Sequence, residues 1–154
     1  MWHNSFGSKF RISIWGASHT PEMGLRIEGV PAGIPLSEDD FEADLSRRRA
    51  SAKGTTARHE KDIPTIVAGV ADGITTGEPI EILFHNGDTR SSDYSQFEAH
   101  NRPSHVDFTA RAKYGADVDL RGSGQFSGRM TLLLVAAGVV AKKIVGGVDY
   151  TTSI

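Results

Sequence analysis

The chain of 154 residues contains no cysteine, and this absence excludes disulfide bonds, a thiol nucleophile and a zinc–thiolate centre. It also favours a reducing compartment, and we expect a cytoplasmic protein. The longest apolar run, residues 132–141, is far shorter than the ~20 residues that a membrane-spanning helix needs. The first residues lack the apolar segment of a signal peptide, so we expect no association with a membrane.

An excess of positive charge is also missing. Lys and Arg number 17 against 19 Asp and Glu, which gives a net charge of -2. This balance argues against a nucleic-acid-binding protein, whose affinity would rest on a basic surface. The charges are nevertheless segregated, with acids at 38–44 and basic residues at 47–61. A solvated charged surface is one interpretation of the basic cluster, and an anion site is the other.

Several segments alternate apolar and polar residues, the pattern of a strand with one buried face. The first two such segments form a predicted hairpin whose loop, residues 18–22, carries His19. Loops rich in small and polar residues are expected at 50–62 and 86–103. The predicted strands cover residues 10–15, 25–27, 63–70, 79–84 and 148–154.

Three segments are predicted to be helical. Ser37 is a good N-cap and Asp40 completes an acidic capping box, so a helix is expected over 38–49. A short helix is expected over 106–114. The segment 130–145 is apolar nearly all round, and we expect this helix to be buried between other layers. Antiparallel hairpins packed on buried helices give an α+β fold in one domain.

A glycine-rich loop, R-G-S-G-Q-F-S-G at 121–128, precedes the apolar helix. Glycines let backbone N–H groups approach a phosphate, and a helix N-terminus adds free donors and partial positive charge. Ser127 and Arg129 add a hydroxyl and a guanidinium. The loop is neither a P-loop nor a dinucleotide-binding fingerprint, and the alternative is that it only turns the chain.

His19 and His105 both fall in predicted loops. An imidazole has an ordinary pKa near neutrality, so either residue is a candidate proton donor; a surface residue is the alternative. The spacing of histidines and carboxylates indicates no metal site, and no G-x-S-x-G elbow is present, which excludes a serine hydrolase of that type. The residues together predict a site for a phosphorylated anion with proton transfer nearby.

The ordered motifs of the chain point to one family. They are N-S-F-G at 4–7, W-G-A-S-H-T at 15–20, D-L-S-R-R-R at 44–49, D-T-R-S-S-D-Y at 88–94, R-P-S-H-V-D at 102–107 and R-G-S-G-Q-F-S-G-R at 121–129. In this order and spacing the sequence resembles the chorismate synthases over essentially all of its residues.

The resemblance implies a lyase of the shikimate pathway, which leads to the aromatic amino acids. Such an enzyme converts 5-enolpyruvylshikimate 3-phosphate to chorismate and phosphate by anti-1,4 elimination, with reduced FMN that is not consumed. Whether the enzyme itself reduces the flavin with NADPH or an outside reductant does so stays open. The resemblance further implies a β-α-β sandwich of antiparallel sheets around a buried helical layer, and a homotetramer.

The resemblance also assigns roles to individual residues. His19 would protonate the departing phosphate and His105 the reduced flavin. The residues that would bind the substrate are Arg48, Arg102, Arg129 and Ser127. Those that would contact the flavin are Arg48, Gln125, Phe126 and Ser127.

The sequence departs from the family pattern at several motif positions. The family has a much longer chain, whose second half supplies a catalytic Asp and much of the flavin pocket. We therefore expect residues 1–154 to be the N-terminal half of a chorismate synthase-like domain that alone binds FMN poorly and forms no chorismate. The alternative is a non-catalytic fragment that keeps the fold and weak anion binding. The departures are Ala17 for Glu, Thr20 for Gly, Ser104 and Ser123 for Gly, Gln125 for Arg or His, and Met130 for Glu.

Overall fold

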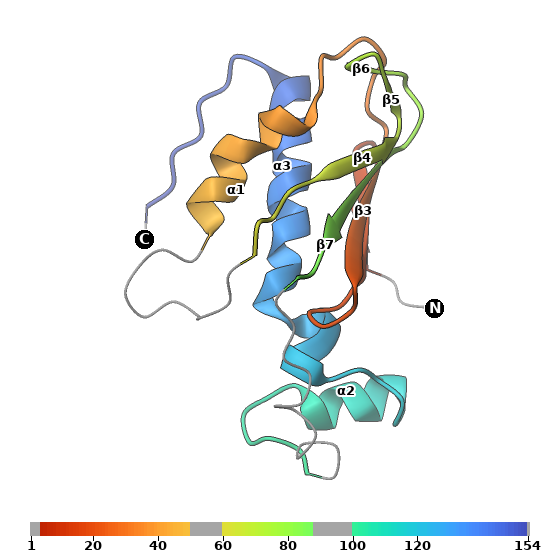
Figure 1. The fold of residues 1–154 in the computed structure, drawn as a ribbon, viewed down its shortest axis with the longest axis vertical. Coiled ribbons are helices and arrows are strands. Elements are labelled where there is room, and N and C mark those ends of the chain that lie inside the picture. Colours follow the sequence, from red (N-terminus) through yellow and green to blue (C-terminus); the bar gives the residue numbers. More distant parts are fainter. Residues whose placement is uncertain (1–3, 50–59, 88–99, 154) are drawn as a thin grey trace.

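A five-stranded antiparallel sheet forms one layer of the molecule (Figure 1). The computed structural model describes residues 4–49, 60–87 and 100–153. Within them the strand order is β1-β2-β3-β7-β4. The strands are β1 Ser5–Phe6, β2 Arg11–Gly16, β3 Glu22–Glu28, β4 Thr65–Ala68 and β7 Ile80–His85.

The predicted hairpin is confirmed, although β3 is longer than expected. β2 and β3 pair from Arg11 opposite Glu28 to Gly16 opposite Met23. The residues between them, 17–21, form the loop that carries His19. The next strand along the sheet, β7, pairs with β3 in register from Glu22 opposite His85. The end of β7 therefore lies beside the start of β3, next to this loop.

The strand predicted over 63–70 is interrupted at Gly69. β4 ends at Ala68 and a separate strand, β5 Val70–Ala71, follows. Gly69 has a φ of 82°, a conformation that favours glycine because it has no Cβ. A turn at residues 72–73 then connects β5 to β6 Ile74–Thr75, and these two strands form a small second sheet.

The first predicted helix begins as a 3₁₀ turn. Residues Glu38–Phe41 form that turn, η1, and α1 continues over Glu42–Arg48. Asp40 accepts the backbone N–H of Ser37 through its Oδ2 at 2.8 Å, which confirms the acidic capping box. The second predicted helix is α2, Asp107–Tyr114.

Helix α3, Thr131–Val145, covers one face of the large sheet (Figure 1). Cross-strand pairs on β3 and β7 present apolar side chains to it, and α1 packs beside it. This arrangement confirms the α+β class. The fully buried residues of this core include Met23, Leu25, Ile27, Ile80, Ile82, Phe84, Leu132, Leu133 and Ala136.

Two expectations about the end of the chain are wrong. Helix α3 is not buried all round, because Leu134 and Val145 are 48% and 55% exposed. No strand forms over 148–153. Gly146 and Gly147 have φ values of 53° and 63° and turn the chain away from the sheet, toward the outer side of α1 (Figure 1).

Within the described ranges no helix is both long and apolar enough to cross a membrane. The loop predicted over 50–62 lies mostly outside those ranges, as does most of the loop predicted over 86–103.

The two adjacent leucines of α3 test this packing. Leu133→Ala is expected to lower the free energy of unfolding by about 2–5 kcal/mol, because it leaves a cavity in a filled core. Leu134→Ala, the matched control on the exposed side, is expected to cost less than about 1 kcal/mol. Urea denaturation measures both, and equal losses would contradict the assignment of the buried face.

Candidate functional site

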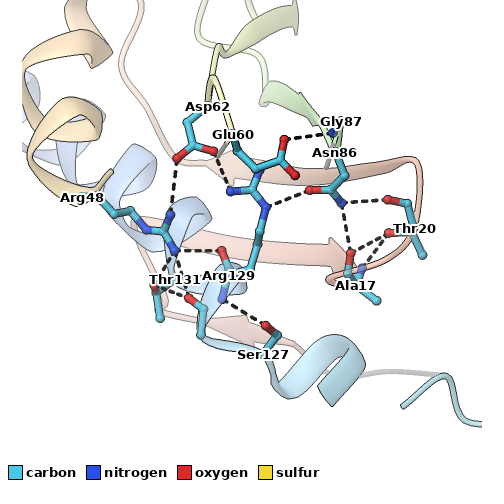
Figure 2. Close-up of polar contacts among 11 residues, drawn as sticks. Ala17, Thr20, Arg48, Glu60, Asp62, Asn86, Gly87, Ser127, Arg129 and Thr131 are labelled. Atoms are coloured by element: carbon cyan, nitrogen blue, oxygen red, sulfur yellow. Dashed lines mark hydrogen bonds and ion pairs between the residues drawn. The ribbon is translucent and has the colours of Figure 1, made fainter. Parts of the chain in front are cut away.

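Two arginines and one buried carboxylate meet beside the start of α3 (Figure 2). Arg129 Nη1 lies 2.6 Å from Asp62 Oδ1, and Arg48 Nη1 lies 3.5 Å from Asp62 Oδ2. The Asp62 side chain is 3% exposed, so this pair is largely removed from water. The structure thus brings together Arg48 and Arg129, two of the predicted substrate residues, through an acid that the sequence did not single out.

Arg48 is the last residue of α1 and reaches across to α3. Its Nη2 donates to the carbonyl oxygens of Gly128 and Arg129 at 3.0 and 3.3 Å and to Thr131 Oγ1 at 3.2 Å. Burial lowers the pKa of the Arg48 guanidinium; the charge of Asp62 opposes this and that of Arg129 adds to it. A guanidinium nevertheless stays cationic near neutral pH.

Arg129 is held on two sides of its guanidinium. Nε donates to Asn86 Oδ1 at 2.8 Å, and Nη1 donates to Asp62. The side chain is 8% exposed, yet its Nη2 is buried without a hydrogen-bond partner in the described part of the chain. A buried charged donor in this state is costly unless a ligand accepts from it. Arg129 therefore fits an anion site.

The His19 loop is closed by Thr20, at the position where the family resemblance leads us to expect Gly. Thr20 Oγ1 accepts from Ala17 N at 2.9 Å and lies 2.7 Å from Glu22 O, to which it donates. Ser18 N donates to Gly124 O at 3.1 Å, which joins this loop to the glycine-rich loop.

His19 lies directly against Gly122. A Cβ added at Gly122 would stand 2.7 Å from His19 Nδ1, so only glycine allows this approach. Asp119 is also close, because the charge of His19 helps Arg121 to lower the pKa of the Asp119 carboxyl.

The glycine-rich loop has an irregular path. Residues 122–124 all have positive φ, between 56° and 69°. Ser123 is one of them, and so is Ser104 (φ 62°) in its own loop. Glycine is the residue that the family resemblance leads us to expect at both positions, and this backbone region favours glycine because it has no Cβ. Ser127 then caps the short 3₁₀ turn Gly128–Met130, η4, by accepting Arg129 N at 3.3 Å.

Gln125 and Phe126 offer a surface that suits a flat, polar ring. Gln125 Oε1 accepts from Asn4 Nδ2 at 3.1 Å, and Gln125 Nε2 is buried with no hydrogen-bond partner among the described residues. Phe126 is 41% exposed, and its ring lies 5.8 Å from that of Tyr114. A buried amide donor next to an exposed aromatic face matches the acceptor atoms and the flat face of a flavin.

Arg102 is engaged differently from the other two arginines. Its Nε and Nη2 make a forked contact with the Asp107 carboxylate at 2.8 and 2.7 Å, and Nη2 also reaches Leu120 O at 3.2 Å. It therefore ties the start of α2 to Leu120, the residue just before the glycine-rich loop. His105 is an exposed residue of the turn before α2, so the two predicted proton donors lie on separate segments.

Asp62 and Asn86 were missed by the sequence reasoning. Both lie in or beside predicted loops without a recognisable motif. The only signal available was position, since Asn86 directly follows the predicted strand that becomes β7. Their roles depend on which strands pair, and that pairing is visible only in the fold.

A substitution in the glycine-rich loop tests the contact with His19. Gly122→Ala should lower the free energy of unfolding by about 2–4 kcal/mol, because it adds a side chain at positive φ and against the imidazole. Gly128→Ala is the control, since nothing lies within 4 Å of its added Cβ. Thermal unfolding compares the two, and an unaffected Gly122→Ala protein would contradict the contact.

The Arg102–Asp107 pair makes stability depend on pH. Hydrogen bonds from Arg102 lower the pKa of the Asp107 carboxyl from 3.8 to about 2, so the pair stabilises the fold above the unfolded-state pKa and loses this contribution as the pH falls from about 4 to 2. Asp107→Asn should cost about 2 kcal/mol at pH 7 and almost nothing at pH 2. Urea denaturation at both pH values measures this, and a constant difference would contradict it.

Comparison with known proteins agrees with the family resemblance. A family model described as chorismate synthase matches residues 10–153. The chain is 57% identical to a chorismate synthase of Chitinophaga pinensis over 143 residues, which cover 93% of this chain and 43% of that protein. It is 47% identical to a chorismate synthase of Syntrophobacter fumaroxidans over 144 residues, 94% of this chain and 41% of the relative.

A solved structure described as a crystal structure of chorismate synthase is also similar. It superposes with a TM-score of 0.61 at 28% sequence identity, covering 90% of this chain and 34% of that one. The chain therefore spans about two-fifths of the length of the curated relatives it matches. Because the family model matches nearly every residue, the chain belongs to the chorismate synthase family.

Proposed function

We propose that the complete protein of which this chain is part converts 5-enolpyruvylshikimate 3-phosphate to chorismate and phosphate by anti-1,4 elimination. The observation that carries the proposal is the pair Arg48 and Arg129 at Asp62, in which the buried Arg129 Nη2 has no hydrogen-bond partner among the described residues, with His19 on an adjoining loop. A site of this kind suits a reaction that expels phosphate and must neutralise it.

The arginines would bind the anionic groups of the substrate. Guanidinium forks match phosphate and carboxylate oxygens, and such charge-assisted hydrogen bonds are the stronger ones. Arg129 would act through Nη2, with Arg48 beside it, and the Ser127 hydroxyl would add a polar contact. Arg102 belongs to the proposal as well, although it would have to share its donors between the substrate and Asp107.

His19 would protonate the phosphate as it leaves. Histidine is the side chain whose unperturbed pKa lies nearest to neutrality, which suits this residue type to proton transfer. The contact with Gly122 places it at the glycine-rich loop, and backbone N–H groups of such a loop can approach a phosphate.

Reduced FMN is the cofactor that the family implies, and the residues present fit it. Gln125, Phe126 and Ser127 would hold the ring system, and Arg48 would contact it from α1. When bound, reduced FMN supplies an electron-rich ring to a reaction that has no net oxidation, so it is not consumed. His105 would donate a proton to the flavin from the turn before α2. A cytoplasmic location and a homo-oligomeric assembly complete the proposal.

Two histidine variants test this function in the complete protein. His19→Ala and His105→Ala should each lower kcat by ~10²–10⁴-fold, the usual contribution of a positioned proton donor, with little change in substrate affinity. Chorismate formation from 5-enolpyruvylshikimate 3-phosphate, measured anaerobically with reduced FMN, gives both parameters.

His85→Ala serves as the control, because this exposed residue at the end of β7 pairs only with the Glu22 carboxylate among its described ion pairs. It should leave kcat unchanged. A loss below tenfold in both test variants would refute the assigned roles, and no chorismate from the wild-type protein would refute the function.

A further inference from the structure

We propose that Asn86 is a positioning residue that couples the Arg129 guanidinium to the loop carrying His19. One amide side chain would thereby fix the anion-binding group relative to the proton donor. The inference deepens the proposed function and rests on it for its kinetic consequence. The coupling concerns geometry alone, so it can be tested without measuring enzyme activity.

The orientation of the Asn86 amide follows from the chemistry of its neighbours. Arg129 Nε can only donate a hydrogen bond, so the atom 2.8 Å away must be the amide oxygen. The carbonyl oxygens of Ala17 and Thr20 can only accept, so the atom at 3.2 and 2.7 Å from them must be the amide nitrogen. The three contacts agree on one orientation of the amide. No other side chain of this size carries both a hydrogen-bond acceptor and an NH₂ donor.

The backbone of Asn86 strengthens the link. Its N–H donates to Pro21 O at 2.9 Å, directly after the pairing of β7 with β3 ends. The Asn86 side chain thus holds the loop 17–21 at two carbonyls, those of Ala17 and Thr20 (Figure 2). The Asn86 main chain holds the loop at a third carbonyl, that of Pro21. His19 lies between the two carbonyls that the side chain binds, so the amide fixes the loop on both sides of this residue.

On the other side of Asn86, Arg129 has little freedom to move. Asp62 holds Nη1 at 2.6 Å while Asn86 holds Nε. Two contacts on different edges of a planar guanidinium define its plane. Nη2 is the one nitrogen of the group that neither contact uses. Rotation of the side chain would break both contacts at once, so the direction in which Nη2 can donate is set by Asp62 and Asn86 together.

The charges of the cluster favour an anion at Nη2. The three contacting side chains, Arg48, Arg129 and Asp62, carry two positive charges and one negative charge. An uncompensated positive charge in a largely buried cluster is unfavourable unless an anion neutralises it. A second carboxylate nearby, that of Glu60, accepts a hydrogen bond from Gly87 N at 2.9 Å. Asn86, being neutral, holds Arg129 without cancelling the charge that attracts the anion.

A spectroscopic experiment tests the coupling without any assay of activity. In the complete protein labelled with ¹⁵N-histidine, the His19 imidazole resonances are assigned by their loss in His19→Ala. Asn86→Ala and Asn86→Asp should both shift these resonances. The aspartate keeps an acceptor for Arg129 but faces the Ala17 and Thr20 carbonyls with a carboxylate, so it releases the loop alone.

Glu81→Gln is the matched control. Glu81 lies on β7, the strand that directly precedes Asn86, and pairs with Arg26 at 2.7 Å on the exposed side of the sheet, so its loss should leave the His19 resonances in place. Far-ultraviolet circular dichroism establishes that each variant is folded. Unchanged His19 resonances in the folded Asn86 variants would overturn the proposal.

A double-mutant cycle on kcat separates positioning from a general loss of structure. Asn86→Ala should lower kcat by about 10- to 100-fold in the wild-type background, the scale expected when a catalytic group is misplaced. In the His19→Ala background the same change should cost less than about threefold, because there is no imidazole left to misplace. Equal losses in both backgrounds would overturn the proposal. If the wild type forms no chorismate, the proposed function fails and the resonances alone decide the coupling.

Discussion

The ion pair between Asp62 and Arg129 is the interaction on which the site depends. Asp62 is 4% exposed and adopts a φ of 51°, so the backbone accepts an uncommon conformation to bring this carboxylate to Arg129. A buried carboxylate needs a partner and a buried guanidinium needs one as well. The Asp62 carboxylate and the Arg129 guanidinium neutralise each other, and Arg48 contacts Asp62 from the end of α1. Three segments distant in sequence are therefore fixed together where α3 begins.

The rest of the site is built outward from this pair. Asn86 extends it to the His19 loop, and Ser18 connects that loop with Gly124. The glycine-rich loop continues into α3, whose apolar side anchors the assembly on the sheet. The antiparallel pairing of β3 with β7 sets where Asn86 falls. The sheet that forms the core therefore also determines where the hydrogen-bond donors of the site lie.

The sequence allowed the local elements to be predicted, because periodicity and capping act over short distances. The hairpin around His19 and the capping box of Ser37 and Asp40 followed from patterns of this kind. The strand expected at 148–154 did not form over its described residues, since a strand needs a partner that alternation alone does not supply. Asp62 and Asn86 could not be predicted for a similar reason. Their roles depend on the strand order and on contacts with Arg129, and no local sequence motif encodes either of these.

The most direct measurement is a crystal structure of the complete protein with inorganic phosphate or the phosphorylated substrate bound. We expect an anion oxygen within hydrogen-bonding distance of Arg129 Nη2, while Asp62 and Asn86 keep their contacts with Nη1 and Nε. We also expect the Asn86 amide still to bind the carbonyls on both sides of His19. An anion bound elsewhere, with Arg129 Nη2 bonded to a protein acceptor, would contradict the proposed site.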